Sequence, residues 1–245
     1  MDKVYVEATY KSLNKLNEEL CGDRVEIVKN DDSYFVVLSD GLGSGVKANI
    51  LSTLTSKIIS TMMFQGASIE DTVETIVHTL PVCSVRKVAY STFMILQISY
   101  DGNAYLVEFD SPGCIFVRDG RLMNIEYNYR SIAGKEIKEA HFKVKPNDFM
   151  MLLSDGVVYA GIGVAYELRL DLENVRRYVV NSVTPDMTAA RLTNMLSETC
   201  KQLYMNKPGD DTTIATVKIV PRKMCVFTVD HQWTKAVMKD WLQNS

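Results

Sequence analysis

Residues 34–41 read Tyr-Phe-Val-Val-Leu-Ser-Asp-Gly, an apolar run that ends in an acid and a glycine. The tetrapeptide Leu-Ser-Asp-Gly returns at 153–156, at the end of a second apolar run. A third acidic sequence, Gly-Asp-Asp-Thr-Thr at 209–213, opens the apolar stretch Ile214–Val220. Short apolar runs of this kind predict buried strands, so acids stand at three strand ends. Such acids repel one another unless a cation lies between them, and the pattern therefore indicates a metal site.

The composition is that of an ordinary globular protein. The 245 residues are 47% hydrophobic and 23% charged, and the net charge is −3. This length suits one large domain, with or without an appendage. Because phosphate-backbone binding requires clustered Lys and Arg, nucleic acid is not expected as the main partner.

Several features predict a cytoplasmic location. The five cysteines show no Cys-x-x-Cys spacing and indicate a reduced, intracellular chain. The first residues lack the apolar core of a signal peptide. The most apolar stretch, 149–166, is interrupted by Asp155 and glycines, so no membrane helix is expected.

The first motif is flanked by strand and helix patterns. Strands are predicted at Arg24–Val28 and Tyr34–Leu38, joined by a turn-rich sequence. The apolar spacing over Ser44–Gln65 predicts a helix. Ser68 is expected to cap a second helix that ends near Leu80.

The middle of the chain has a β-type pattern. Between Tyr90 and Ile125, short apolar runs are divided by turn sequences and predict an antiparallel meander. Asp101-Gly102 and Asp119-Gly120 are each followed at once by a returning strand, so both are interpreted as hairpin turns. The Asp-Gly pair at 40–41 leads instead into a glycine-rich loop and a long helix, so it is interpreted as part of a site.

The second half of the chain predicts further strands and two helices. Residues 139–153 predict a hairpin with a turn at Pro146–Asp148. Helices are expected at Asp171–Val183 and Pro185–Tyr204, the second with Thr184 as its N-cap. A last strand is expected at Thr212–Val220.

The order of the elements indicates the fold class. Strands, two helices, more strands, two helices and a strand lack the regular alternation of a doubly wound parallel sheet. The sequence therefore predicts an α+β protein in which two antiparallel sheets pack together with helices outside. Loops that carry the acids would then lie at one edge.

The three acidic motifs resemble those of a known family in sequence and in order. Ser39-Asp40-Gly41-x-Gly43-x-Gly45, residues 153–157 (Leu-Ser-Asp-Gly-Val) and residues 209–213 are similar to the motifs of metal-dependent serine/threonine phosphatases. The chain resembles the SpoIIE-like (stage II sporulation protein E) branch of the protein phosphatase 2C (PP2C) superfamily. The resemblance implies a four-layer αββα sandwich over residues 1–220, and it leaves 221–245 as a C-terminal extension of unknown role.

The resemblance also implies roles for individual residues. Asp40 would bridge two divalent cations, the Gly41 carbonyl would bind one of them, and Asp155 and Asp210 would complete the shell of the second. Asp211 would bind a metal through water or cap its loop. Oxygen ligands of this kind select Mn²⁺ or Mg²⁺. Two such ions can activate a water for direct in-line attack on phosphorus, which makes Asp40, Asp155 and Asp210 the expected catalytic residues.

Other polar residues carry weaker signals. Asp23 resembles a Gly-Asp pair that precedes the first hairpin in the family, but a solvated turn acid is an equally good interpretation. Arg24 and Lys47 are candidates for a phosphate contact only because they lie near the motifs. The three histidines lie outside the motifs and are expected to be structural.

The expected activity is hydrolysis of phosphoserine or phosphothreonine in a phosphorylated protein, for example an anti-anti-sigma-factor-like regulator, in bacterial signalling. The main alternative is a catalytically weak signalling or binding module of the same fold. A metal-dependent nuclease or phosphodiesterase shares the acids but is disfavoured by the acidic pI. Nucleotide binding by Gly41-x-Gly43-x-Gly45 is disfavoured because the glycine spacing differs from the Rossmann fingerprint.

The C-terminal extension has an apolar pattern of its own. Trp233, Val237 and Trp241 recur every four residues within a helix-like segment, His231–Leu242. Packing on the domain is the default interpretation, and docking to a partner is the alternative.

Overall fold

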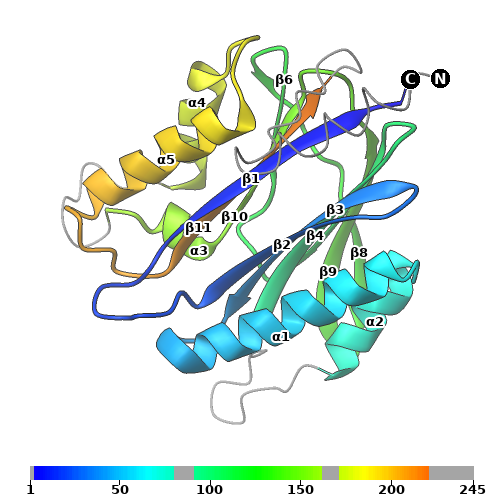
Figure 1. Ribbon diagram of the computed structural model, residues 1–245, viewed down its shortest axis with the longest axis horizontal. Helices are drawn as coiled ribbons and strands as arrows, with labels where there is room; N and C mark the ends of the chain where they lie inside the picture. The colour runs from blue at the N-terminus through cyan, green and yellow to red at the C-terminus, as the bar shows by residue number, and fades with distance from the viewer. Residues whose placement is uncertain (1–2, 80–90, 162–170, 221–245) are drawn as a thin grey trace, which may run out of the picture.

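The computed structural model describes residues 3–79, 91–161 and 171–220, which form two antiparallel sheets with helices on their outer faces (Figure 1). The α+β class and the αββα sandwich are confirmed. Residues 221–245, with the predicted helix-like segment, lie outside the described ranges, so the division of the chain at residue 220 stays a prediction.

The first sheet has five strands and joins the two ends of the described chain. Its order is β1 (Tyr5–Leu13), β11 (Thr212–Val220), β10 (Phe149–Leu153), β6 (Ile115–Arg118) and β7 (Arg121–Leu122). β11 pairs with β1 over its whole length and with β10 on its other side. The second and third acidic motifs therefore start or end neighbouring strands of one sheet.

The second sheet has six strands and carries the first acidic motif. Its order is β2 (Asp23–Lys29), β3 (Ser33–Gly41), β4 (Ser91–Ser99), β5 (Asn103–Phe109), β9 (Lys135–Lys143) and β8 (Asn128–Ile132). β3 is buried along nearly all of its length because both faces of the sheet are covered. Its side chains alternate: Val36 and Leu38 face the other sheet, whereas Phe35 and Val37 face the helices.

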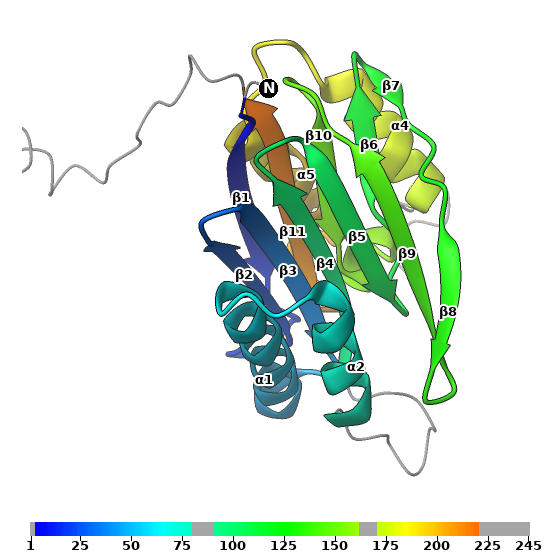
Figure 2. The same ribbon diagram turned by 90° about the vertical axis from the view of Figure 1, so that its right-hand side faces the viewer.

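Helices cover the outer faces of both sheets (Figures 1 and 2). α1 (Gly45–Phe64) and α2 (Ile69–Thr79) pack on the six-stranded sheet, while α3 (Asp155–Val158), α4 (Leu172–Ser182) and α5 (Ala189–Leu203) lie on the five-stranded sheet. Three hydrophobic cores result, one between the sheets and one under each helical layer. None of the helices in the described ranges is long and apolar enough to cross a membrane.

Two of the predicted strand pairings are wrong. Residues 139–153 do not form a hairpin, because β9 pairs with β5 and β8 whereas β10 pairs with β11 and β6. The turn at 146–148 instead carries the chain from one sheet to the other. A buried ion pair holds this turn: Arg118 donates from Nε and Nη2 to Asp148, and the Lys145 amide donates to the same carboxylate.

The predicted meander over 90–125 is also wrong beyond its first hairpin. β4 and β5 pair as expected, but after Phe109 the chain crosses to the other sheet and forms β6. Both Asp-Gly turns are confirmed, since they join β4 to β5 and β6 to β7. At the second turn Asp119 and Gly120 have φ values of 50° and 69°, the left-handed conformation that two-residue hairpin turns require.

Helix positions agree with the sequence except at one start. Ser68 Oγ accepts from the Asp71 amide, as expected of a cap for α2. Asp171 caps α4 in the same way. The last helix begins later than predicted, because Thr188 rather than Thr184 is the N-cap and accepts from the Arg191 amide. Thr184 instead donates to Asp186 in the preceding turn.

Candidate active site

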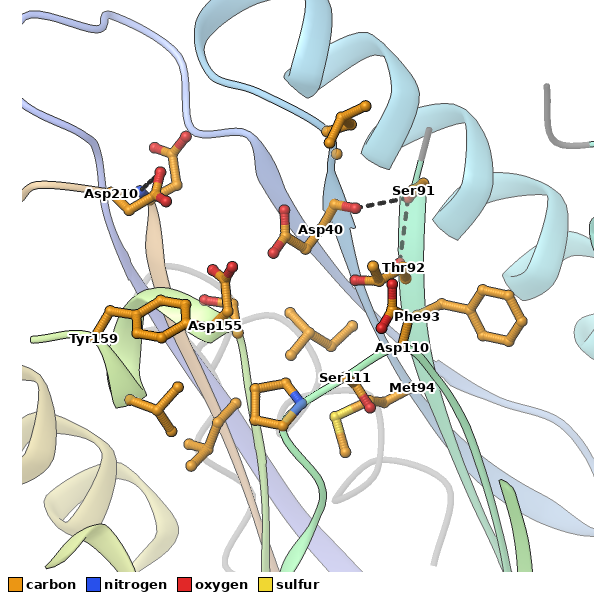
Figure 3. A pocket seen from close by; sticks show the side chains of 18 of the residues that line it. Asp40, Ser91, Thr92, Phe93, Met94, Asp110, Ser111, Asp155, Tyr159 and Asp210 are labelled. Atoms are coloured by element: carbon orange, nitrogen blue, oxygen red, sulfur yellow. Dashed lines mark hydrogen bonds between the residues drawn. The ribbon is translucent and has the colours of Figure 1, made fainter. Parts of the chain in front are cut away.

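The three acidic motifs converge on one pocket of about 680 Å³ at the edge where both sheets end. Its walls include all five residues that the sequence assigned to the site. These are Asp40, Gly41, Asp155, Asp210 and Asp211. Figure 3 shows the carboxylates of Asp40, Asp155 and Asp210 around one common space. The structure brings the predicted residues together, whereas their role as metal ligands stays a prediction.

Asp40 stands at the end of β3, directly opposite Asp23 of β2 and Thr92 of β4. The preceding Ser39 is fully buried, and its hydroxyl lies 2.7 Å from that of Ser91. Ser91 Oγ also donates to the Asp40 carbonyl at 2.9 Å (Figure 3). These contacts fix the strand end, so the serine of the first motif is structural.

The glycine of each Leu-Ser-Asp-Gly motif permits a close approach between two backbone segments. A Cβ atom on Gly41 would lie 2.1 Å from the Ala48 carbonyl oxygen in the first part of α1. On Gly156 it would lie 2.1 Å from the Asp211 carbonyl oxygen. Neither position has room for a side chain, and in both cases the approach is to protein backbone.

Asp155 begins α3, and its position depends on β11. Ser154 Oγ accepts from the Thr213 amide at 2.8 Å, and the Ser154 amide donates to the Thr213 carbonyl. Tyr204 Oη donates to the Gly156 carbonyl at 2.7 Å. The second and third motifs are therefore bonded to each other directly.

Asp210 and Asp211 have different environments in the third motif. Asp210 Oδ1 accepts from the Asp211 amide, and Lys15 Nζ lies 3.6 Å from the same oxygen. Asp211 is buried; its Oδ1 accepts from the Lys15 amide, while its Oδ2 has no hydrogen-bond partner. Asp211 thus caps the loop between β1 and β2 with one oxygen and leaves the other unsatisfied.

Asp23 is not the solvated turn acid that the sequence allowed. It is 4% exposed, and neither of its carboxylate oxygens has a hydrogen-bond partner. Burial raises the pKa of Asp23 to about 7, and the charges of Asp211 and Asp155 add to this rise. The Ser154 and Thr213 hydroxyls lie near enough to moderate it. Asp23 therefore belongs to the acidic site.

The other acids raise one another's pKa in the same way. Burial raises the pKa of Asp40 to about 9, with further increases from the charges of Asp23 and Asp155. Burial raises the pKa of Asp155, and the charge of Asp210 raises it further. Hydrogen bonds with the Gly156 amide and with Asp40 lower this pKa and offset part of the rise. The shared cause is that several carboxylates occupy one partly desolvated space.

The donor set suits hard divalent cations. Buried carboxylate oxygens without partners are costly unless a cation or a proton satisfies them, and Asp23 and Asp211 both have such oxygens. In the ranges that the structure describes, no three His, Cys, Asp or Glu side chains converge closely enough to form a complete binding cluster by themselves. Mg²⁺ and Mn²⁺ sites of carboxylates commonly retain several waters, so the residues fit these ions.

Sequence reasoning missed two residues that line the pocket, Lys15 and Asp110. Asp110 directly follows the apolar strand β5, which is the same signal that identified Asp40 and Asp155. Lys15 lies in a polar loop, and no local pattern marked it. Arg24, which the sequence offered for a phosphate contact, instead pairs with Glu26. Two of the histidines, His78 in α2 and His141 in β9, lie outside the pocket; the third, His231, falls outside the described residues.

The fold is similar to that of several solved structures. No curated protein sequence matches the chain significantly. One similar structure is the PP2C phosphatase domain with a fragment of the regulatory domain of SpoIIE from Bacillus subtilis, with a TM-score of 0.77 and 20% identity; the match covers 90% of this chain and 65% of that one. The chain therefore spans less than two thirds of that structure.

Two further structures share the fold over most of their length. RsbX in complex with magnesium has a TM-score of 0.63 and 17% identity, with 89% of this chain and 100% of that one covered. A serine/threonine phosphatase of S. agalactiae has a TM-score of 0.65 and 15% identity, with 87% and 99% covered. At these identities the similarity establishes the fold.

A sequence profile of a protein family settles the relationship. The profile described as stage II sporulation protein E (SpoIIE) matches residues 30–220, which include all three acidic motifs. The resemblance inferred from those motifs is confirmed. The chain therefore belongs to the SpoIIE family, whose fold is that of PP2C phosphatase domains.

Proposed function

We propose that the chain is a serine/threonine phosphoprotein phosphatase that binds two divalent cations, Mn²⁺ or Mg²⁺. One observation carries the proposal: acids from three separate motifs line a single pocket, beside buried carboxylate oxygens that have no hydrogen-bond partner. Membership of the SpoIIE family and the PP2C-type fold support the same reaction class.

The residues that would hold the cations come from both sheets. Asp40 and the Gly41 carbonyl extend from the six-stranded sheet, and Asp155, Asp210 and Asp211 extend from the five-stranded sheet. Divalent ions in such a site neutralise phosphate charge and lower the pKa of a bound water, which supplies the nucleophile. Asp23, opposite Asp40, would add negative charge that strengthens cation binding.

Lys15 is the residue that we assign to the substrate phosphate. It is the only Lys or Arg among the described residues that line the pocket. A phosphate monoester carries up to two negative charges and must enter a pocket lined by acids. An ammonium group at the edge of the pocket, now 3.6 Å from Asp210, would attract and position it.

The substrate that we propose is a phosphoserine or phosphothreonine side chain on a regulatory protein, of the anti-anti-sigma-factor kind that the family resemblance implied. The pocket opens at the molecular edge and is lined by polar loops, an arrangement suited to a side chain presented on a protein surface. The role of the chain would then be regulatory dephosphorylation.

The test combines metal binding with hydrolysis. Calorimetric titration of the metal-free protein with Mn²⁺ should give saturable binding that Asp155→Asn weakens strongly. Hydrolysis of p-nitrophenyl phosphate and of a phosphopeptide should depend on Mn²⁺ and stop with a chelator. Metal binding without hydrolysis of either substrate would favour the catalytically weak module, and cleavage of a phosphodiester would favour a nuclease.

A further inference from the structure

Helix α1 carries its polar and apolar residues in an unusual arrangement. The side that faces the six-stranded sheet buries several small hydroxyl residues: Ser52, Thr55, Ser56 and Ser60. Their hydroxyls donate to carbonyls of the same helix; Thr55 Oγ1, for example, donates to Leu51 O at 2.9 Å. Polar residues therefore occupy much of the side that a surface helix normally fills with apolar ones.

The outward side of α1 is correspondingly apolar. Val46, Ile50 and Leu54 recur every four residues, and each is between 51% and 63% exposed. We call these three residues the α1 stripe. Phe64, near the end of the same helix, is 61% exposed. A row of large exposed apolar side chains on one helix indicates a binding surface.

The C-terminal extension contains a matching pattern. Trp233, Val237 and Trp241 follow the same spacing of four residues as the α1 stripe. In a helix, eight residues rise by about 12 Å, so the two rows would have equal length. Two amphipathic helices with rows of this kind can bury their apolar sides against each other.

The charges beside the two rows are complementary. α1 contains no acid, and its charged residues are Lys47 and Lys57, both exposed. At 100° per residue, Asp240 falls beside the tryptophan row of the extension, whereas Lys235 and Lys239 fall on the opposite side. A helix that packs on α1 through its tryptophans would therefore turn its own lysines away from those of α1, of which Lys57 also pairs with Glu26.

The end of the described chain lies within reach of α1. Val220 pairs with Tyr5, and the Val4 amide donates to the Tyr100 carbonyl. Beside Tyr100 lies the turn between β2 and β3, where Asn30 Nδ2 donates to the Met63 carbonyl near the end of α1. The end of β11 and the end of α1 thus lie on the same side of the molecule (Figure 1).

The intervening chain is long enough for the connection. Residues 221–232 can span up to about 40 Å when extended. The whole of α1 is about 30 Å long. Leu54 lies ten residues, or about 15 Å, before the end of α1, so a segment of this length allows the row Trp233–Trp241 to lie antiparallel along the α1 stripe.

We propose that residues 231–242 form an amphipathic helix that packs on the α1 stripe of the same chain. The proposal does not depend on the phosphatase activity. It assigns an occupant to the exposed apolar side of α1 and a role to the extension that follows β11.

The chain supplies its own probe, because Trp233 and Trp241 are its only tryptophans. In the 245-residue protein, tryptophan emission should be blue-shifted and protected from acrylamide quenching. Ile50→Asp and Leu54→Asp should each shift the emission to the red and remove the protection. Met205→Asp is the matched control, since Met205 is also exposed but follows α5 in the other helical layer. It should leave the emission unchanged.

The results of this experiment distinguish between the segments that could cover the α1 stripe. Circular dichroism should show that each variant is folded, because the substituted positions are exposed. Emission of the wild-type protein that equals that of a free 221–245 peptide would overturn the proposal. An emission shift that appears only as protein concentration rises, together with a dimer in light scattering, would replace it with packing between two copies.

Discussion

Asp23 and Asp40 lie directly opposite each other in the antiparallel register of β2 and β3. Like charges in such cross-strand positions are destabilising. Burial adds to the effect and raises the pKa of both carboxyls, to about 7 for Asp23 and about 9 for Asp40. The six-stranded sheet thus places two acids opposite each other, and one of them, Asp40, lines the pocket where we propose that cations bind.

Asp40→Asn should distinguish the destabilising repulsion between Asp23 and Asp40 from the proposed role of Asp40 in cation binding. Without metal, the variant should be more stable than the wild type by about 1 kcal/mol, because the repulsion of Asp23 is removed. With Mn²⁺, the wild type should gain stability and the variant should gain little, since ligands that bind the folded state stabilise it. Thermal unfolding in chelator and in Mn²⁺ measures both effects.

The matched control is Asp119→Asn in the exposed turn between β6 and β7, where Asn also adopts the left-handed conformation. It should behave as the wild type in both conditions. Equal stabilisation of the wild type and Asp40→Asn by Mn²⁺ would show that Asp40 does not hold a cation.

Lys15→Gln should weaken catalysis without affecting the fold. Loss of a charge-assisted contact to phosphate, worth about 1.5–3 kcal/mol, corresponds to a decrease in kcat/KM of about 10- to 150-fold. Steady-state kinetics with a phosphopeptide measure it. Lys11→Gln, at a residue of β1 that pairs with Glu198 at the surface, should leave kcat/KM unchanged. If both lysine variants had the same kinetics as the wild type, Lys15 would have no part in substrate binding.

Gly156→Ala should destabilise the domain by about 1–3 kcal/mol, the usual cost of overpacking, because the new Cβ would meet the Asp211 carbonyl. Urea denaturation measures the loss. Gly209→Ala is the control, since its Cβ would come no closer than 3.4 Å to the Tyr204 ring. Equal stability of the two variants would contradict the close approach between α3 and β11.

Glu108→Gln should change how stability depends on pH. Burial raises the pKa of Glu108, although the Cys114 amide and the Tyr127 hydroxyl both donate to its Oε1. Between the unfolded pKa of about 4.3 and the higher folded pKa, the folded state binds more protons, so stability falls as pH rises. This contribution is complete below the unfolded pKa and is lost as pH rises through the folded pKa.

Glutamine keeps the accepting oxygen but cannot ionise. The free energy of unfolding of Glu108→Gln, relative to the wild type, should therefore increase from pH 4 to pH 7, as measured by urea denaturation in chelator. Glu136→Gln, at an exposed residue of β9, serves as the reference substitution and should give a flat difference. A flat difference for Glu108→Gln as well would contradict the raised pKa.

Local sequence patterns were sufficient for most elements. Alternation and apolar runs located β2, β3 and β11, and helical spacing located α1 and α4. These patterns depend on residues within a few positions of each other, so they can be recognised without knowledge of the fold. The start of α5 was misplaced because Thr184-Pro185 and Thr188 are both acceptable helix starts locally, and the choice depends on tertiary contacts such as the bond from the Ala189 amide to Glu7 Oε1 of β1.

Strand pairing could not be obtained in the same way. β9 and β10 are neighbours in sequence with a turn between them, yet they belong to different sheets. The choice depends on which strand faces complete each hydrophobic core, and on the buried bond between Arg118 and Asp148 that holds the crossing turn. Both are contacts between distant parts of the chain.

The sequence by itself determined the family, the fold class and the acids of the three motifs, because each motif is a short local pattern at a strand end. Only the tertiary structure decided that Lys15 and Asp110 line the pocket, that Asp23 is buried opposite Asp40, and that α1 turns an apolar row outward. The physical reason is that burial and proximity are properties of the packed sheets. The local sequence around Asp23 is equally compatible with an exposed turn and with a buried site. Only the pairing of β2 with β3 places Asp23 opposite Asp40.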